Sequence, residues 1–191
     1  MQMKQLELFQ DFKNTEISNK GVDVSKIEMK YKSGSINAKE SNRLIKKLNN
    51  LPSGVFYASP QGHPKLTTMP FVKNEETSNI LAIGANRNQY PCVNVGGVTI
   101  AMHKLICSCF HKNLKPKTNT IVDHINKDNE DTIYEILEAF NWDLYDVSVG
   151  WQYVDWRIEN LRWASEAENR KNPQRKKSIN FNPQWVNWEH I

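Results

Sequence analysis

The chain has 191 residues, of which 39% are hydrophobic and 24% charged, with eight glycines and eight prolines. This composition excludes collagen-like, wholly disordered and membrane-spanning classes, and the length suits one compact domain with an appendage or two small domains. Three cysteines, Cys92, Cys107 and Cys109, are too few for a disulfide framework or a four-thiolate zinc site. The N-terminus lacks a basic stretch followed by an apolar run, so we expect a cytoplasmic protein in a reducing compartment.

Charge is unevenly distributed along the chain. The formal net charge of +4 divides into +9 for residues 1–122, −9 for 123–169 and +4 for 170–191. Two basic flanks around an acidic middle favour a polyanionic partner for the flanks. Carboxylates in the middle segment then serve a metal or a protein partner. Solvated surface charge is the alternative explanation of the same pattern.

The first part of the chain predicts a polar arm followed by a basic helix. Residues 1–34 show little hydrophobic periodicity after the first dozen, so we expect a flexible arm. Residues 37–50 then predict an amphipathic helix, with Arg43, Lys46 and Lys47 largely away from its apolar face.

Two hairpins and a buried helix are predicted next. Residues 55–59 and 65–69 flank a Pro-Gln-Gly-His-Pro turn and predict a small hairpin, and residues 74–78 a polar loop. The Gly96-Gly97 pair predicts a second hairpin between 89–95 and 98–102, because adjacent glycines accept the positive φ angles of a two-residue turn. The apolar run from His103 to Phe110 predicts a buried helix.

The chemistry-bearing residues lie in two short segments further along. The sequence Ile-Val-Asp-His predicts a strand end at which the side chains of Asp123 and His124 diverge to opposite sides. Downstream, residues 160–163 predict a short strand, and Ser165 and Glu168 have the spacing of a capping box. This box places Asn169 about one turn into a helix.

Together these segments resemble the HNH nuclease family, in the phage and intron-encoded branch whose motif ends in Asn rather than His. The matching segments, in family order, are MHKLICSCFHKN, IVDHINKDN and RIENLRWASEAENRKN. The nine-residue offset from Asn160 to Asn169 also fits the family pattern. The resemblance implies an α+β fold with a ββα-metal HNH nuclease core, joined here to a small N-terminal α/β segment and a structured acidic insertion.

The resemblance also implies a role for each matching residue. Asp123 and Asn169 match the metal ligands, His124 the general base, and Asn160 the Asn that braces the loop and orients the imidazole. Two oxygen ligands favour Mg²⁺ or Mn²⁺ over zinc. In this family a DNA phosphodiester is hydrolysed to 5′-phosphate and 3′-hydroxyl ends. The alternative is that Asp123 caps a turn and His124 is structural.

Several further residues receive an expectation with an alternative. His103 is expected to hydrogen-bond the local scaffold, and Cys107 and Cys109 to belong to the core. The candidate phosphate-binding residues near the motif are Arg162, Arg170 and Lys171. They could equally form ordinary surface salt bridges. We expect most non-specific DNA affinity from residues 36–85 and 170–191, including Arg43, Lys46, Lys47, Arg175, Lys176 and Lys177.

The sequence departs from the family between His124 and Asn160, which are 36 positions apart instead of roughly a dozen. Apolar residues in the insertion, about 130–154, predict a helix containing Ile133 and Phe140 and then a strand over 147–153. Residues 128–155 hold eight acidic residues and no Lys or Arg. The insertion either projects from the DNA face and binds a protein or the basic N-terminal part, or it thickens the core.

A second short motif lies near the N-terminus. The segment Gln5-Leu6-Glu7-Leu8-Phe9 resembles the pentapeptide with which bacterial replication and repair proteins bind the β sliding clamp. In that interpretation Leu8 and Phe9 enter a hydrophobic pocket and Gln5 hydrogen-bonds at its edge. The alternative is an amphipathic helix in which Leu6 and Phe9 cover the core.

The sequence therefore predicts four parts: an arm (1–34), a helix-hairpin DNA-contacting region (35–85), the nuclease domain (86–173) and a basic, aromatic tail (174–191). We expect an Mg²⁺- or Mn²⁺-dependent endonuclease of duplex DNA, of homing or free-standing phage type, in the bacterial cytoplasm if phage-encoded. Two alternatives stay open: a non-catalytic DNA-binding or clamp-associated regulator, and a restriction or packaging-associated nuclease.

Overall fold

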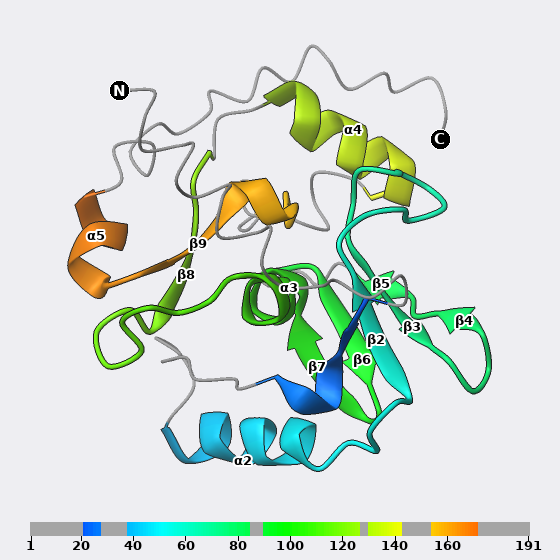
Figure 1. The fold of residues 1–191 in the computed structure, drawn as a ribbon. Helices are drawn as coiled ribbons and strands as arrows, with labels where there is room; N and C mark the ends of the chain where they lie inside the picture. Colours follow the sequence, from blue (N-terminus) through cyan, green and yellow to red (C-terminus); the bar gives the residue numbers. More distant parts are fainter. Residues whose placement is uncertain (1–20, 28–37, 85–89, 127–129, 143–153, 172–191) are drawn as a thin grey trace.

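The computed structural model describes residues 21–27, 38–84, 90–126, 130–142 and 154–171 (Figure 1). These residues form a mixed α+β protein, as the sequence predicts, with two small antiparallel sheets, a separate two-stranded ribbon and four α-helices. No described helix combines the length and the apolar character that a membrane crossing requires.

The elements follow one another in a simple order. The first sheet contains β1 (Val22–Asp23), β2 (Phe56–Ser59), β3 (Phe71–Asn74) and β4 (Asn79–Ile80), in that spatial order. The second sheet contains β5 (Ile83–Gly84), β6 (Cys92–Val95) and β7 (Val98–Ala101), and the ribbon β8 (Ile121–His124) and β9 (Leu161–Ala164). The helices are α2 (Ala38–Asn49), α3 (Met102–Phe110), α4 (Glu130–Phe140) and α5 (Glu166–Lys171), and two 3₁₀ turns are η2 (Val24–Lys26) and η4 (Ile158–Asn160).

The first sheet corrects part of the prediction of a flexible arm over residues 1–34. Residues 21–27 fold onto the body, since β1 pairs with β2, and Val24 and Ile27 are buried in the core. The carboxylate of Asp23 fixes this segment because it accepts four hydrogen bonds at 2.8–3.0 Å. The donors are the Ser25 N–H and hydroxyl, the Ser53 hydroxyl and the Gly54 N–H.

The predicted hairpin partner of residues 55–59 is wrong. The strand that pairs with β2 is β3, not the segment 65–69. Residues 60–70 form a loop instead, because their three prolines lack the N–H that a ladder needs and other backbone groups bond within the loop. Those bonds run from the Gly62 N–H to the Thr67 carbonyl and from the Met69 N–H to the Leu66 carbonyl.

The predictions for the second hairpin and the following helix are confirmed. β6 and β7 are joined by Gly96 and Gly97, whose φ angles of 56° and 80° are both positive. Two consecutive positive φ angles match the right-handed twist of the strands. α3 follows β7 directly and buries Met102, Leu105 and Cys107.

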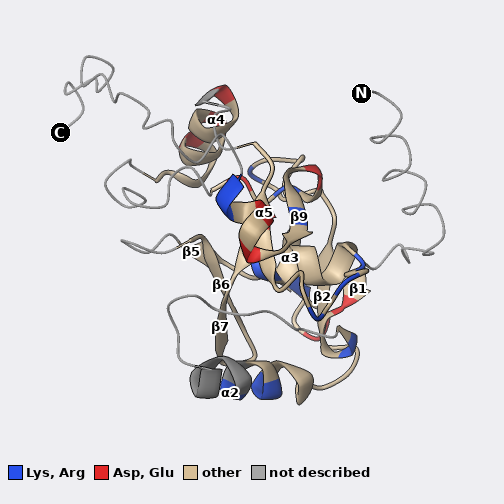
Figure 2. Ribbon diagram, turned by 90° about the vertical axis from the view of Figure 1, so that its left-hand side faces the viewer, with Lys and Arg blue, Asp and Glu red and all other residues tan. Residues whose placement is uncertain are grey.

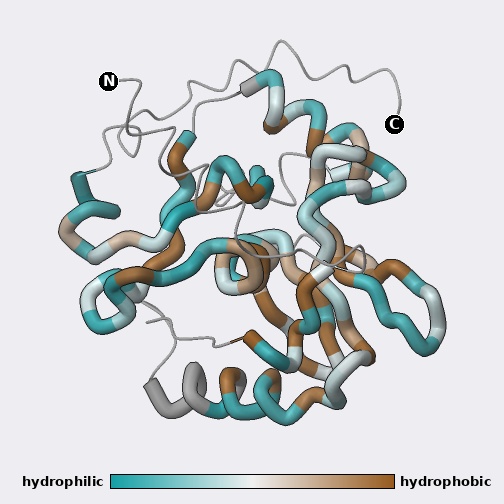
Figure 3. Tube along the Cα trace, in the orientation of Figure 1, coloured by the Kyte–Doolittle hydropathy of each residue, from teal (hydrophilic) through white to brown (hydrophobic). Residues whose placement is uncertain are grey.

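One continuous hydrophobic core joins the sheets and the helices. Hydrophobic positions are concentrated in α3 and the strands around it, and α3 lies between the ribbon and the sheets (Figures 1 and 3). On the outside, α2 carries basic residues and α4 acidic ones (Figure 2). The basic helix predicted for 37–50 is thus confirmed as α2, with Leu48 buried and Arg43 exposed.

The described part of the insertion is the helix α4, as predicted. Its apolar residues Ile133, Ile136, Leu137 and Phe140 are buried in the common core. The Phe140 ring lies 5.4 Å from that of Trp156, between ring centroids, so α4 thickens the core. Its outer face is exposed and acidic, and the strand predicted for 147–153 lies outside the described residues.

Candidate active site

The ribbon brings the two chemistry-bearing segments together. β8 and β9 are antiparallel, with Asp123 opposite Arg162 and His124 opposite Leu161. The strand predicted at residues 160–163 begins one residue later, because Asn160 closes the 3₁₀ turn η4. Residues 39 positions apart in the sequence are therefore direct cross-strand neighbours.

Asp123 is buried and forms an ion pair with Arg162. The carboxylate is 1% exposed, and its Oδ2 accepts hydrogen bonds from Arg162 Nε at 3.0 Å and Nη2 at 2.7 Å. The Arg162 side chain is 46% exposed. The sequence left two roles open for Arg162, a phosphate-binding residue or a partner in a salt bridge. The structure shows a salt bridge, with the buried carboxylate of Asp123 as the partner. A buried carboxylate needs such compensation, because desolvation without a partner costs several kcal/mol.

His124 lies in a cluster of three rings with Tyr90 and His103. Its ring is parallel to that of Tyr90 at 6.2 Å and lies 5.0 Å from that of His103, measured between ring centroids. Burial, the neighbouring His124 and Lys104 lower the pKa of His103 well below its usual value. The Nδ1 atom of His103 makes no hydrogen bond in the described part of the chain. The ring of His103 packs against that of Tyr90, with the two ring centroids 4.2 Å apart.

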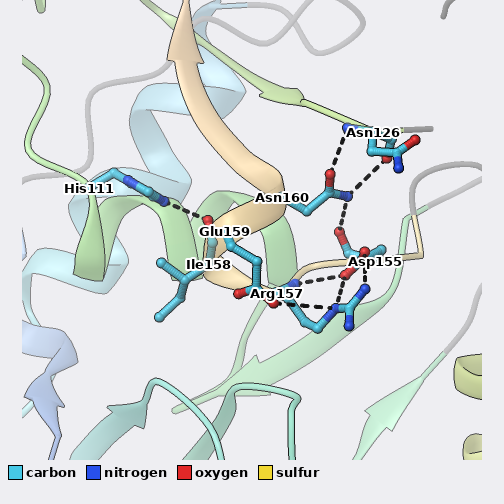
Figure 4. A network of polar contacts seen from close by, with 7 residues as sticks. All are labelled: His111, Asn126, Asp155, Arg157, Ile158, Glu159 and Asn160. Atoms are coloured by element: carbon cyan, nitrogen blue, oxygen red, sulfur yellow. Dashed lines mark hydrogen bonds and ion pairs between the residues drawn. The ribbon is translucent and has the colours of Figure 1, made fainter. Parts of the chain in front are cut away.

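Asn160 fastens the chain that follows His124 (Figure 4). Its side chain is buried, with Oδ1 accepting from the Asn126 N–H at 2.7 Å and Nδ2 donating to the Asn126 carbonyl at 3.1 Å. Nδ2 also donates to the Asp155 carbonyl at 3.2 Å, and the Ile125 N–H donates to the Asn160 carbonyl at 2.7 Å. These bonds fix the exit of β8 and hence the backbone of His124.

The turn that contains Asn160 is itself held from both sides. The Asp155 carboxylate accepts from Arg157 Nε and Nη2, each at 2.9 Å, and this ion pair raises the pKa of Arg157 (Figure 4). The His111 Nε2 donates to the Ile158 carbonyl at 2.8 Å, and Trp163 Nε1 donates to the His111 carbonyl at 2.8 Å. The end of α3 is thereby fixed to both η4 and β9.

Sequence reasoning missed several of these supporting residues. Tyr90 lies 34 positions before His124, and no sequence pattern connects them. Asn126 belongs to the matching segment, but its two bonds to the Asn160 side chain required the fold. Only the Asp155–Arg157 pair carried a local signal, an acidic and a basic residue two positions apart.

The capping box that precedes Asn169 is present. The Ser165 hydroxyl accepts from the Glu168 N–H at 3.2 Å, and Glu168 Oε2 accepts from the Ser165 N–H at 2.7 Å. These reciprocal bonds begin α5, which contacts both β8 and β9. Asn169 is half-buried in α5. Because α5 contacts β8, the helix that contains Asn169 packs against the strand that contains Asp123.

The remaining predicted contact residues are either exposed or lie outside the described residues. Arg170 pairs with Glu166, one helical turn away, and Lys171 is exposed. On α2, Lys46 and Lys47 are exposed beside Arg43. Several predicted residues lie outside the described residues: Gln5, Leu6, Leu8, Phe9, Arg175, Lys176 and Lys177.

The donor atoms near the ribbon suit a hard cation. The candidates are the carboxylate of Asp123 and the carboxamide of Asn169, both oxygen donors, which Mg²⁺ and Mn²⁺ prefer. Among the described residues no group of three or more His, Cys, Asp or Glu side chains could hold a metal. By donor chemistry alone, one carboxylate and one carboxamide would suit the expected cation, with water and phosphate oxygens as further ligands.

Comparisons of the chain with protein-family models, with curated proteins and with solved structures give no match.

Proposed function

We propose that the chain is a divalent-metal-dependent DNA endonuclease of the HNH kind, of homing or free-standing phage type. One observation carries the proposal. A carboxylate and an imidazole end one strand of a short ribbon, and a buried Asn from just before the other strand clamps the chain directly after them. The motif resemblance and the two basic flanks support the same conclusion.

Each residue then has a chemical task. His124 takes a proton from the water that attacks the phosphorus, which requires a neutral imidazole. Asn160 holds the backbone of His124 in place. Asp123 and Asn169 would hold Mg²⁺ or Mn²⁺, which would supply positive charge against the negative charge of the reacting phosphate. The resulting ends are 5′-phosphate and 3′-hydroxyl.

A non-catalytic DNA-binding regulator is the second candidate, and the Asp123–Arg162 ion pair favours it. The guanidinium already compensates the buried carboxylate without a metal. In such a regulator the basic residues bind DNA, and the ribbon serves only as a scaffold.

Plasmid nicking separates the two candidates. We expect the full chain to nick supercoiled DNA in Mg²⁺ and not in EDTA, and His124→Gln to lower the rate at least about 100-fold, the usual scale of general-base catalysis. His63→Gln is the matched control, since His63 is also buried but lies in the loop between β2 and β3, where it packs against Phe71 of β3 and Phe140 of α4. It should nick at the parent rate.

Two results contradict the nuclease proposal. One is a parent chain that binds duplex DNA but does not nick it in Mg²⁺ or Mn²⁺, and this result supports the regulator. The other is a His124→Gln variant that nicks as fast as the parent chain.

A further inference from the structure

The loop between α3 and β8 combines positive charge with an outward apolar side chain. We call residues 112–118 the lysine loop. Lys112, Lys115 and Lys117 are all exposed, and the loop contains no acidic residue. Leu114 lies among these lysines and is 71% exposed, more than any other large hydrophobic residue in the described ranges. No described part of the protein covers this side chain.

Internal hydrogen bonds give the lysine loop a fixed shape. Asn113 spans its base, with Nδ2 donating to the Asn119 carbonyl at 2.6 Å and Oδ1 accepting from the Lys115 N–H at 3.1 Å. The Lys115 carbonyl accepts from the N–H groups of Thr118 and Asn119 at 3.0 and 2.8 Å. Leu114 is therefore held outward by a preorganised turn, and binding through it costs little conformational entropy.

The lysine loop lies beside the candidate active site. It starts directly after His111, which is hydrogen-bonded to β9 and η4, and it leads into β8. The Ser165 hydrogen bonds lower the pKa of Glu168, and Lys115 and Arg162 lower it further, so both cations are near this carboxylate of α5. Figure 1 shows the loop turning next to α5. The lysines, Arg162 and the helix of Asn169 therefore share one side of the molecule.

We propose that the lysine loop is a minor-groove wedge, in which the lysines bind phosphates on both strands and Leu114 enters a base step near the cleaved bond and kinks the duplex. The inference rests on the proposed DNA substrate and adds a mode of recognition to it. Apolar wedges flanked by cations kink DNA because unstacking one step lets more of the protein contact the backbone. A leucine among lysines also suits an anionic lipid surface, but a membrane needs more apolar area than one side chain supplies.

The wedge is tested with a duplex labelled at both ends for energy transfer. His124→Gln serves as the parent chain, so that the DNA stays intact. Leu114→Ser should abolish the bend and weaken binding about tenfold, the scale of burying one leucine side chain. Tyr134→Ser is the matched control, because Tyr134 is also an exposed large side chain, 46% accessible, but lies on the acidic helix α4. It should leave both the bend and the affinity unchanged.

The lysines are tested through the salt dependence of binding. Each phosphate contact contributes about 0.9 to the slope of log affinity against log salt, so replacing Lys112, Lys115 and Lys117 by Gln should lower the slope by about 2 to 3. Tyr134→Ser, which changes no charge, is again the control and should leave the slope unchanged.

Unchanged bending and affinity in Leu114→Ser, or an unchanged salt slope in the triple variant, overturns the wedge. Leu114-dependent binding to phosphatidylserine vesicles, without any effect on DNA, overturns it in favour of a lipid surface. The proposed nuclease activity fails differently, in a chain that bends DNA through Leu114 but never nicks it.

Discussion

The first sheet and the ribbon each bury an aspartate, but they compensate its charge in different ways. Asp23 accepts hydrogen bonds from four neutral donors of its own turn and the neighbouring loop, and the exposed Lys26 ammonium lies farther away, 3.6 Å from its Oδ2. Asp123 pairs with Arg162, a cation whose side chain reaches the surface. Neutral backbone and serine donors belong to the fold and cannot leave. The hydrogen bonds to Asp123 from Arg162, at 2.7 and 3.0 Å, come instead from a charged side chain, so the two carboxylates differ in their main partner rather than in burial.

The buried histidines of the two regions differ in the same way. His63 packs between the rings of Phe71 and Phe140, and its Nδ1 accepts from the Lys65 N–H at 3.1 Å. His124 lies among titratable rings and next to Asp123 in the chain. His63 has one ionisable neighbour, Lys65, and burial together with this cation lowers the pKa of His63. Its ring contacts are with phenylalanines, as is typical of a structural histidine, whereas a cluster of titratable rings is more typical of a functional one.

The largest expected effect comes from neutralising each aspartate in turn. We expect Asp123→Asn to lower the nicking rate at least about 100-fold, because it removes the charged ligand of the proposed cation. Asp23→Asn should nick at the parent rate when it is assayed well below its unfolding temperature. Equal losses in both variants would show that the two regions do not differ in function.

In stability the order should be reversed, with a larger loss in Asp23→Asn than in Asp123→Asn. Asn offers one acceptor oxygen where Asp23 offers two, so Asp23→Asn should lower the free energy of unfolding by about 2 kcal/mol at pH 7, measured in urea. Burial alone would raise the pKa of Asp23, but its hydrogen bonds to Ser25, Ser53 and Gly54 together lower it below 3.8.

The sign of the pH dependence follows from that lowered pKa. The unfolded chain binds the proton more tightly, so the contribution of Asp23 is complete above about pH 3.8 and is lost as the pH falls through the lower folded value. The gap between parent and Asp23→Asn should therefore narrow below pH 3.8. A gap that is constant down to pH 2 would contradict this explanation.

A smaller effect is expected at Arg162. Carboxylates that bind metals are oriented by hydrogen bonds, and the loss of such a partner typically costs tenfold or more in metal affinity. We expect Arg162→Gln to weaken Mn²⁺ binding about tenfold, measured by calorimetry without DNA. Tighter binding in the variant would mean that Arg162 competes with the cation. Arg157→Gln, which disturbs the Asp155 pair instead, is the control.

Most predictions that depend on local patterns agree with the structure, although the hairpin predicted over residues 55–69 is wrong. The examples that agree are the capping box of Ser165 and Glu168, the Gly96-Gly97 hairpin and the apolar face of α4, and each involves residues at most about ten positions apart. The hairpin failed for a local reason, the prolines of residues 60–70, whereas the error over residues 21–27 arose from distant groups. Residues 21–27 join a sheet because Asp23 finds donors in Ser53 and Gly54, about 30 positions away. No property of the segment itself reveals those donors.

The features of the candidate site likewise fall into those that local sequence determined and those that only the tertiary structure decided. The sequence by itself determined that Asp123 and His124 end a strand, that Asn169 lies about one turn into a capped helix, and that the insertion begins with an amphipathic helix. These features follow from backbone geometry and hydrophobic periodicity, which act over a few residues. Only the tertiary structure decided that Arg162 pairs with Asp123, that Tyr90 and His103 enclose His124, and that Leu114 is exposed beside the site. Such contacts depend on strand register and on the packing of distant segments, which the order of residues does not reveal locally.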